Sequence, residues 1–177
     1  MAQNLTPMKS NLWSSAATNG FLLALVTVIV TLFSTAFPMN VGINLLITIV
    51  KLVVTIGLLY YFMKSFGQEV DTYPYGTAFT YGFAVSFCSN IVIACYFWVH
   101  YTLLFPDAIE KALKGMQQAL AQYPIDQASL DFVMNNLPVI MSVAPLILYT
   151  LFGLIFAAIL ANFAKKAELP FTDETEA

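Results

Sequence analysis

Arginine is absent from this 177-residue sequence, and its seven basic residues are all lysines. Without arginine the chain lacks the planar group that most often holds phosphate or carboxylate ligands by two parallel hydrogen bonds. The formal net charge is −3, and most of the charged residues lie in predicted loops and tails. No basic surface is available for nucleic acid, so we expect no nucleic-acid partner.

The motifs of several common catalytic sites are missing as well. The sequence has no C-x-x-C, H-E-x-x-H or G-x-S-x-G motif and no phosphate-binding glycine loop. Its two cysteines, Cys88 and Cys95, would lie roughly 10 Å apart on a helix, too far for an intrahelical disulfide. We interpret them as packing residues, and we expect no enzyme activity, metal or cofactor.

The only histidine, His100, lies beside Trp98 and Tyr101 near the end of a predicted membrane span. No cysteine or carboxylate stands at ligand spacing from it, so the sequence indicates no metal site. We interpret His100 as a neighbour of aromatic residues at the membrane interface. A pH-sensing role would rest on the residue type alone.

Hydrophobic residues, by contrast, are abundant. They make up 59% of the chain against 10% charged residues, whereas soluble domains carry about 25% charged residues. Four segments reach the length of roughly 20 residues that spans a bilayer, and they cover about 20–37, 41–63, 77–104 and 138–163. The breaker-rich turn at 38–42 joins the first two as an antiparallel hairpin. We expect an all-α, polytopic membrane protein with four transmembrane helices in one membrane domain over residues 1–177.

The first segment has a competing interpretation as a cleaved signal peptide. Lys9 precedes its apolar core, and Ser34-Thr35-Ala36 fits the small-x-small pattern that precedes a cleavage site. The polar residues between Lys9 and the core would make an unusually long leader. Both interpretations stay open at this point.

The distribution of lysines predicts the orientation. The lysines that would share one side of the membrane are Lys9, Lys64, Lys165 and Lys166. The other side would have only Lys111 and Lys114, in a loop that also holds several acidic residues. The positive-inside rule then places both termini in the cytoplasm.

Residues 106–136, between the third and fourth spans, form the only sizeable predicted extramembrane part. Pro106 and Asp107 are typical of a helix start, and Asp126 is typical of the N-cap of a second short helix. We expect an amphipathic helical hairpin that lies on the outer interface or packs over the mouth of the bundle. A groove that binds a partner is the alternative. The acidic tail at 167–177 is expected to be disordered.

Residues from about Thr72 to Lys166 resemble a known family. The likeness rests on 75–82 (YGTAFTYG), on 105–111 (FPDAIEK) and on the last apolar span, which contains Gly153 and ends in Lys165-Lys166. These motifs are similar to small bacterial membrane proteins, mostly from Bacteroidota, catalogued as domain of unknown function 4199. The order Pro106-Asp107 departs from the family's Asp-Pro. The resemblance implies a four-helix protein of the inner membrane with no assigned activity, and it carries over no functional residues.

The second span contains the candidate functional residue Lys51, the one charged side chain inside the long apolar segments. An ammonium there costs about 3 kcal/mol on insertion scales, so Lys51 should face a polar surface. Helical spacing brings Asn44, Thr48 and Thr55 onto its face. The other spans carry similar stripes of small and polar residues. No carboxylate lies deep in any span to pair with it.

Three interpretations of Lys51 stay open. The stripes can be packing seams, in which small residues and cross-helix hydrogen bonds join the helices. They can instead line a polar cavity for a small ligand or ion, formed by Lys51, Thr31, Asn90 and Tyr149. Snorkelling of Lys51 to an interface is the third possibility, although roughly 15 Å separate it from the outer end of its helix.

These observations predict a structural or accessory component of the membrane, with the lipid bilayer around it and a membrane-protein partner or a second copy of the chain beside it. A small transporter or channel-like protein with a polar cavity around Lys51 is the alternative. An intramembrane enzyme ranks third.

Overall fold

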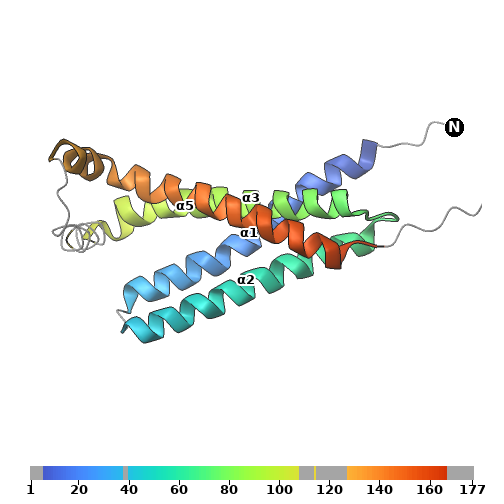
Figure 1. The fold of residues 1–177 in the computed structure, drawn as a ribbon, viewed down its shortest axis with the longest axis horizontal. Helices are drawn as coiled ribbons and strands as arrows, with labels where there is room; N and C mark the ends of the chain where they lie inside the picture. Colours follow the sequence, from blue (N-terminus) through green and yellow to red (C-terminus); the bar gives the residue numbers. More distant parts are fainter. Residues whose placement is uncertain (1–5, 38–39, 108–113, 115–126, 167–177) are drawn as a thin grey trace, which may run out of the picture. The chain divides into compact units, whose positions relative to one another are not determined.

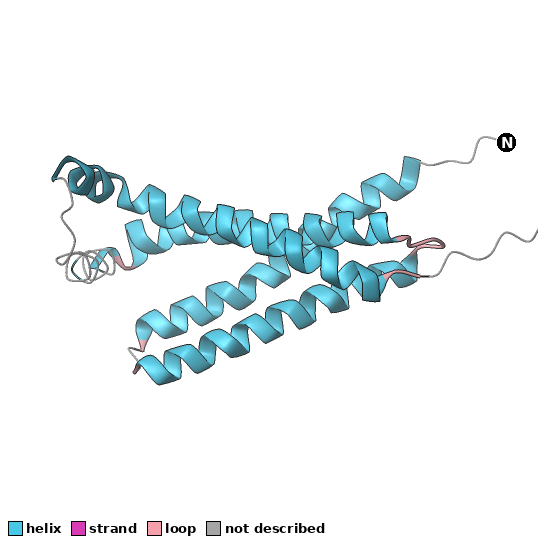
Figure 2. Ribbon diagram, viewed as in Figure 1, coloured by secondary structure: helices cyan, strands magenta, loops and turns pink. Residues whose placement is uncertain are grey.

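The structure is a computed structural model, and it describes residues 6–37, 40–107, 114 and 127–166. Every regular element of these residues is helical (Figure 2). In chain order the elements are α1 (Thr6–Ala36), α2 (Val41–Glu69), α3 (Tyr75–Val99), the π-helix η1 (His100–Leu104) and α5 (Gln127–Ala164), as labelled in Figure 1. The predicted all-α class is confirmed.

Four helical stretches of the described chain are long and apolar enough to cross a membrane. They are Leu12–Ala36, Val41–Glu69, Tyr75–Leu104 and Val139–Ala164. Each exceeds the roughly 20 residues that a bilayer requires. The protein is therefore a multi-pass membrane protein, as the composition predicts.

Two helix boundaries differ from the predicted ones. The first helix already begins at Thr6, whereas the apolar pattern placed the first span near Gly20. The polar residues between these points are compatible with a helix even though they carry no hydrophobic signal. The last helix begins at Gln127, so the predicted second short helix and the predicted last span are one element. The remainder of the predicted extramembrane hairpin, except residues 106, 107 and 114, and the acidic tail lie outside the described residues.

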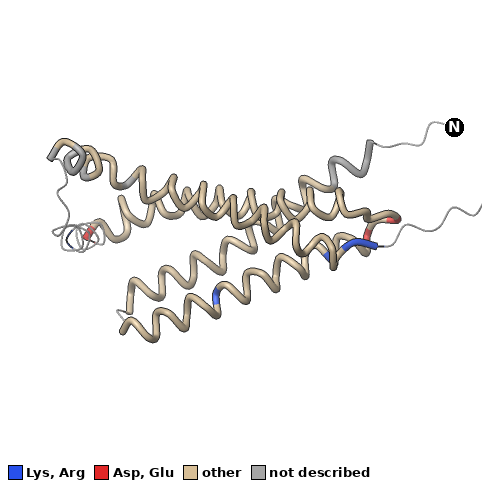
Figure 3. The backbone as a smooth tube through the Cα atoms, in the orientation of Figure 1, with Lys and Arg blue, Asp and Glu red and all other residues tan. Residues whose placement is uncertain are grey.

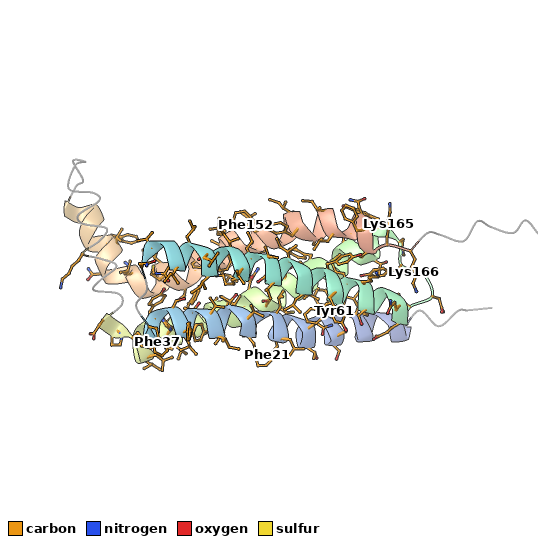
Figure 4. The ribbon with its side chains drawn as sticks, turned by 90° about the horizontal axis from the view of Figure 1, so that it is seen from below. Phe21, Phe37, Tyr61, Phe152, Lys165 and Lys166 are labelled. Atoms are coloured by element: carbon orange, nitrogen blue, oxygen red, sulfur yellow. The ribbon has the colours of Figure 1, made fainter. Side chains whose placement is uncertain are left out.

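Pro138, inside α5, explains why sequence patterns separated these two segments. Proline has no backbone N–H and its ring clashes with the preceding turn, so a helix that contains proline bends. Figure 4 shows the first turns of α5 leaning away from the axis that the next turns follow. The helix continues through the proline, but it changes direction.

The helices form two compact units. Unit 1 contains the described residues up to Ser89 together with those from Phe152 onward, and unit 2 contains the described residues of 90–151. Helices α3 and α5 each contribute one part to each unit. The prediction of a single membrane domain stays a prediction.

The α1–α2 hairpin of unit 1 is fixed at its turn by a side-chain cap. Asn40 precedes α2 in an extended conformation, and its Oδ1 accepts a hydrogen bond of 2.9 Å from the backbone N–H of Ile43. This bond satisfies one of the donors that a helix start leaves unpaired. The two helices run antiparallel, as the turn residues predict (Figure 1). Residues near the start of α1 therefore lie beside residues near the end of α2.

Close packing in unit 1 depends on glycines. A Cβ added to Gly20 would lie 2.7 Å from the backbone oxygen of Val85 and 3.0 Å from the backbone nitrogen of Ser89. At Gly82 it would meet the side chains of Met63 at 2.7 Å and Ala157 at 3.2 Å. The small-residue stripes predicted on α1, α3 and α5 therefore include buried helix–helix contacts in this unit.

An aromatic cluster joins α2 to the start of α3. The rings of Phe66 and Tyr81 stack with centroids 4.1 Å apart, and Tyr73 packs edge-on against Phe66. All three side chains are buried. The Lys166 backbone N–H donates to the carbonyl of Tyr73 at 3.0 Å, and its Nζ donates to the carbonyl of Val70 at 3.0 Å. These bonds hold the α2–α3 loop against the end of α5.

Candidate functional site

The four residues predicted to line a polar cavity are divided between the two units. Thr31 and Lys51 lie in unit 1, and Asn90 and Tyr149 lie in unit 2. Asn90 is buried, and its Nδ2 donates a hydrogen bond of 3.4 Å to the hydroxyl of Thr150. This bond is a cross-helix contact of the kind expected in a packing seam. A cavity shared by the four residues stays a prediction.

Lys51 lies on the half-buried face of α2, with Asn44 and Thr55, as the helical spacing predicts. Thr48 is exposed, and its hydroxyl donates to the backbone oxygen of Asn44 at 2.8 Å. Among the described residues, no hydrogen bond or ion pair reaches the Lys51 ammonium. Figure 3 shows this basic position within a long uncharged run of α2. Lys51 is therefore half-buried, and no hydrogen bond or ion pair among the described residues offsets the cost of burying its charge.

The segment of α2 that carries Lys51 contains no buried residue. None of residues 41–58 is buried, and Val41 and Val53 keep 85% and 64% of their surface exposed. The second half of α2 contrasts with it, because Leu59, Phe62 and Phe66 are buried there. The first half of α2 is therefore an open helical surface with one charge near its middle.

Sequence reasoning missed a polar groove between α1 and α2, at the other end of the hairpin. It has a volume of about 470 Å³ and is open on one side. Its lining residues are Ser14, Ser15, Thr18, Asn19, Tyr61, Phe62, Ser65, Phe66 and Glu69. The groove therefore has a polar wall from α1 and a mixed aromatic and polar wall from α2.

Tyr81 of α3 anchors the α1 wall of this groove. Its hydroxyl lies 2.9 Å from the Ser15 hydroxyl and accepts a hydrogen bond of 2.7 Å from Nδ2 of Asn19. Because the Tyr81 ring is fully buried and stacks on Phe66, the hydroxyl is held at a fixed position. Ser15 and Asn19 therefore have defined orientations in the groove.

The α2 wall offers polar groups that the described chain does not use. The hydroxyls of Tyr61 and Ser65 and the carboxylate of Glu69 form no hydrogen bond or ion pair within the described residues. Figure 4 labels Tyr61, which lies between the ribbons of α1 and α2. The groove therefore presents unpaired acceptors and one negative charge.

A count along the hairpin could have found this groove. Ser15 and Asn19 are four residues apart, as are Ser65 and Glu69, so each pair lies on one helix face. A turn near residue 39 would bring 14–19 opposite 59–64 in an antiparallel hairpin, with Ser65 and Glu69 directly following along the same helix. Residues 14–19 precede the first apolar segment, and polar faces were predicted only within the apolar segments, so the two stretches were not paired.

Next to the groove, Tyr73 has an unpaired hydroxyl. Its side chain is 1% exposed, and its hydroxyl has no hydrogen-bond partner among the described residues. Burial and, to a smaller extent, the nearby Tyr81 raise the pKa of Tyr73 above its ordinary value. The phenol therefore stays neutral, but its oxygen is desolvated without a compensating bond.

His100 has aromatic neighbours, as the sequence predicts. Its ring packs edge-on against Tyr101 with centroids 5.0 Å apart, and only 1% of its surface is exposed. Its position at the membrane interface stays a prediction. Its Nδ1 lies 2.9 Å from the Tyr96 hydroxyl, and its ring packs on Phe105. The π-helical turn η1, in which the Phe105 N–H donates to the His100 carbonyl at 2.8 Å, brings this aromatic group together.

Comparison with known proteins places the chain in a family. Residues 18–166 match the family described as "Protein of unknown function (DUF4199)". A search of curated proteins and a search of solved structures gave no match. The match covers α2, α3, η1, α5 and most of α1, which is most of the chain, so the resemblance in the sequence motifs is confirmed. This four-span membrane protein belongs to the DUF4199 family of proteins of unknown function.

Proposed function

We propose that this protein is an accessory component of a membrane assembly rather than an enzyme. The first half of α2 packs against a helix of another membrane protein, and that helix carries a carboxylate near the depth of Lys51. The observation that carries this proposal is the half-buried ammonium of Lys51, which has no partner among the described residues, on a helix segment with no buried residue.

The depth of Lys51 makes an ion pair the favoured solution. Ten residues separate it from Val41, which corresponds to about 15 Å along the helix. This is about half of the 30 Å hydrocarbon core, so the side chain cannot easily extend to water from there. A partner carboxylate would offset part of the cost of about 3 kcal/mol that an ammonium carries at the centre of a span.

A different protein fits this surface better than a second copy of the chain. The only carboxylate within the four spans is Glu69, 18 residues from Lys51 and about 27 Å along α2. A second copy packed through the same face would bring another lysine to the same depth, and like charges repel. The partner must therefore supply an acidic residue that this chain lacks.

Co-purification from native membranes in a mild detergent tests this proposal. We expect a partner to accompany the wild-type chain and to be lost from Lys51→Met, because the methionine keeps the length of the side chain and removes its charge. Lys64→Met is the matched control, since Lys64 is exposed near the other end of α2. Recovery of the same partner with Lys51→Met, or of the wild-type chain alone, contradicts the proposal.

A transporter with a polar cavity around Lys51 is the second candidate, supported by the half-buried polar face that Asn44, Lys51 and Thr55 share. In a background without Cys88 and Cys95, Lys51→Cys should then react with a hydrophilic thiol reagent as readily as Val41→Cys, which is highly exposed. A cysteine at 51 that stays unmodified while the one at 41 reacts rules out this candidate.

The proposal includes a location in the inner membrane of a bacterial cell with both termini in the cytoplasm. The lysines near the span ends support this orientation. If all four segments span the membrane, Lys64, Lys165 and Lys166 lie on the same side as the amino terminus, and lysines concentrate on the cytoplasmic side. A reporter enzyme fused to the carboxyl terminus that is active only in the cytoplasm tests it. Activity of a periplasmic reporter at the same position would reverse the orientation.

A further inference from the structure

The groove between α1 and α2 has the features of a ligand site that the proposed accessory role does not use. It is formed within unit 1, and its α1 wall is held in place by the buried Tyr81 hydroxyl. Because the wall is preorganised, a ligand would not bear the cost of ordering these side chains.

The hydrogen-bonding character of the groove selects the ligand. Asn19 forms its hydrogen bonds through Nδ2, which leaves its amide oxygen available as an acceptor. The Glu69 carboxylate can only accept, and the Ser65 hydroxyl lies on the same helix face one turn away. Among the residues whose side chains the structure describes, no lysine lines the groove. Acceptors and one negative charge require a ligand that brings donors and a positive charge.

The groove also lies at a depth where headgroups of lipids are found. Its residues come from the first part of one span, Leu12–Ala36, and the last part of another, Val41–Glu69. Trp13 and Tyr61 are exposed beside it or within it, and such aromatic residues concentrate at membrane–water interfaces. A ligand in the groove would therefore reach both the headgroup layer and water.

We propose that this groove binds a primary ammonium group at the membrane surface, donated either by a phosphatidylethanolamine headgroup or by a soluble amine. The Glu69 carboxylate, the Asn19 amide oxygen and the Ser65 hydroxyl line the groove and are the acceptors for the N–H donors of the ammonium group. Tyr61 and Phe62 cover the carbon atoms next to the nitrogen. A quaternary ammonium group has no N–H to donate and is bound more weakly.

Lipid titration of the delipidated full-length protein, followed by native mass spectrometry, tests the site. Phosphatidylethanolamine and phosphatidylcholine with the same acyl chains differ only in the methylation of the headgroup nitrogen. We expect phosphatidylethanolamine to bind roughly tenfold more tightly, the size of effect that a charge-assisted hydrogen bond supplies. Equal binding of the two lipids overturns the proposal, because lipid that only surrounds the protein would show no preference between the headgroups.

Two matched variants assign the binding to the groove. Glu69→Gln should weaken phosphatidylethanolamine binding by roughly tenfold, since the exposed side chain keeps its shape and loses its charge. Asp71→Asn removes an exposed acid two residues away that does not line the groove, and it should change binding by less than about twofold. Equal binding by wild type and Glu69→Gln, with the same thermal unfolding midpoint, contradicts the assignment.

Competition with ethanolamine in solution identifies the source of the ammonium group. Displacement of the bound lipid by millimolar ethanolamine indicates a site for amines in general, and a lack of displacement indicates the lipid headgroup. Both outcomes support the site if Glu69→Gln weakens binding. Ser65→Ala gives an independent check, because it removes one acceptor and no charge and should also weaken binding. If Ser65→Ala and Glu69→Gln both bind phosphatidylethanolamine with wild-type affinity, the proposal is overturned.

Discussion

The two halves of α2 contrast within one continuous helix. Residues 41–58 have no buried member, whereas Leu59, Phe62, Met63, Phe66 and Gly67 are all buried in the second half. The exposed half is the richer in aliphatic side chains, so burial does not follow hydropathy along this helix. In a membrane, apolar side chains gain nothing from leaving lipid, and close packing of particular shapes decides which surface is internal. This contrast is the basis for the proposal that the first half contacts a partner outside the chain.

The largest expected difference between substitutions in the two halves of α2 is in the free energy of unfolding. Phe66→Ala should lower the free energy of unfolding by about 3–5 kcal/mol, because it empties the space between Tyr81 and Tyr73. Val53→Ala in the exposed half should stay within about 0.5 kcal/mol. Thermal unfolding in one detergent measures both. Similar losses for the two variants would mean that the halves do not differ in packing.

Glycine substitutions sharpen the same contrast with a smaller change. Gly20→Ala should destabilise the protein by about 1–3 kcal/mol, since the new methyl group would meet backbone atoms of Val85 and Ser89 that cannot move independently. Gly57→Ala in the exposed half has no neighbouring atom within 4 Å and should be neutral or slightly stabilising. The shift in unfolding midpoint separates them, and a stable Gly20→Ala protein would refute the close α1–α3 approach.

The smallest expected effects concern two tyrosine hydroxyls whose rings pack on Phe66 in the second half of α2. Tyr81→Phe should cost about 0.5–1.5 kcal/mol, because it removes the bonds to Ser15 and Asn19. Tyr73→Phe should be neutral or stabilising by about 1 kcal/mol, since its buried hydroxyl has no partner among the described residues. The same unfolding assay applies, and a reversed order of the two variants would contradict the hydrogen-bond assignment.

The sequence was sufficient for the class of fold and for the faces of the helices. Four apolar stretches predicted four spans, and helical spacing placed Asn44, Lys51 and Thr55 on one half-buried face. These features are local, since they follow from hydropathy and from the helical period. The turn at Asn40 was also local, because its side chain caps α2 directly.

The features that sequence reasoning missed depend on distant contacts. The groove requires α1 and α2 to be paired in register, and Tyr81 to reach it from a third helix. The contacts of His100 with Tyr96 and Phe105 were also not predicted, because hydropathy does not report a π-helical turn. The continuity of α5 through Pro138 was missed for a similar reason, since proline signals a break even where the helix only bends.

Photo-crosslinking along the first half of α2 tests the central claim most directly. Val54 is exposed and lies three residues after Lys51, close to the same side of the helix. Ile49 is exposed and lies on the side of the helix opposite to Lys51, so a photoreactive residue there serves as the control. In native membranes we predict a protein adduct from position 54 that disappears when Lys51→Met is added, and lipid adducts from position 49. Lipid adducts alone from both positions would contradict the account.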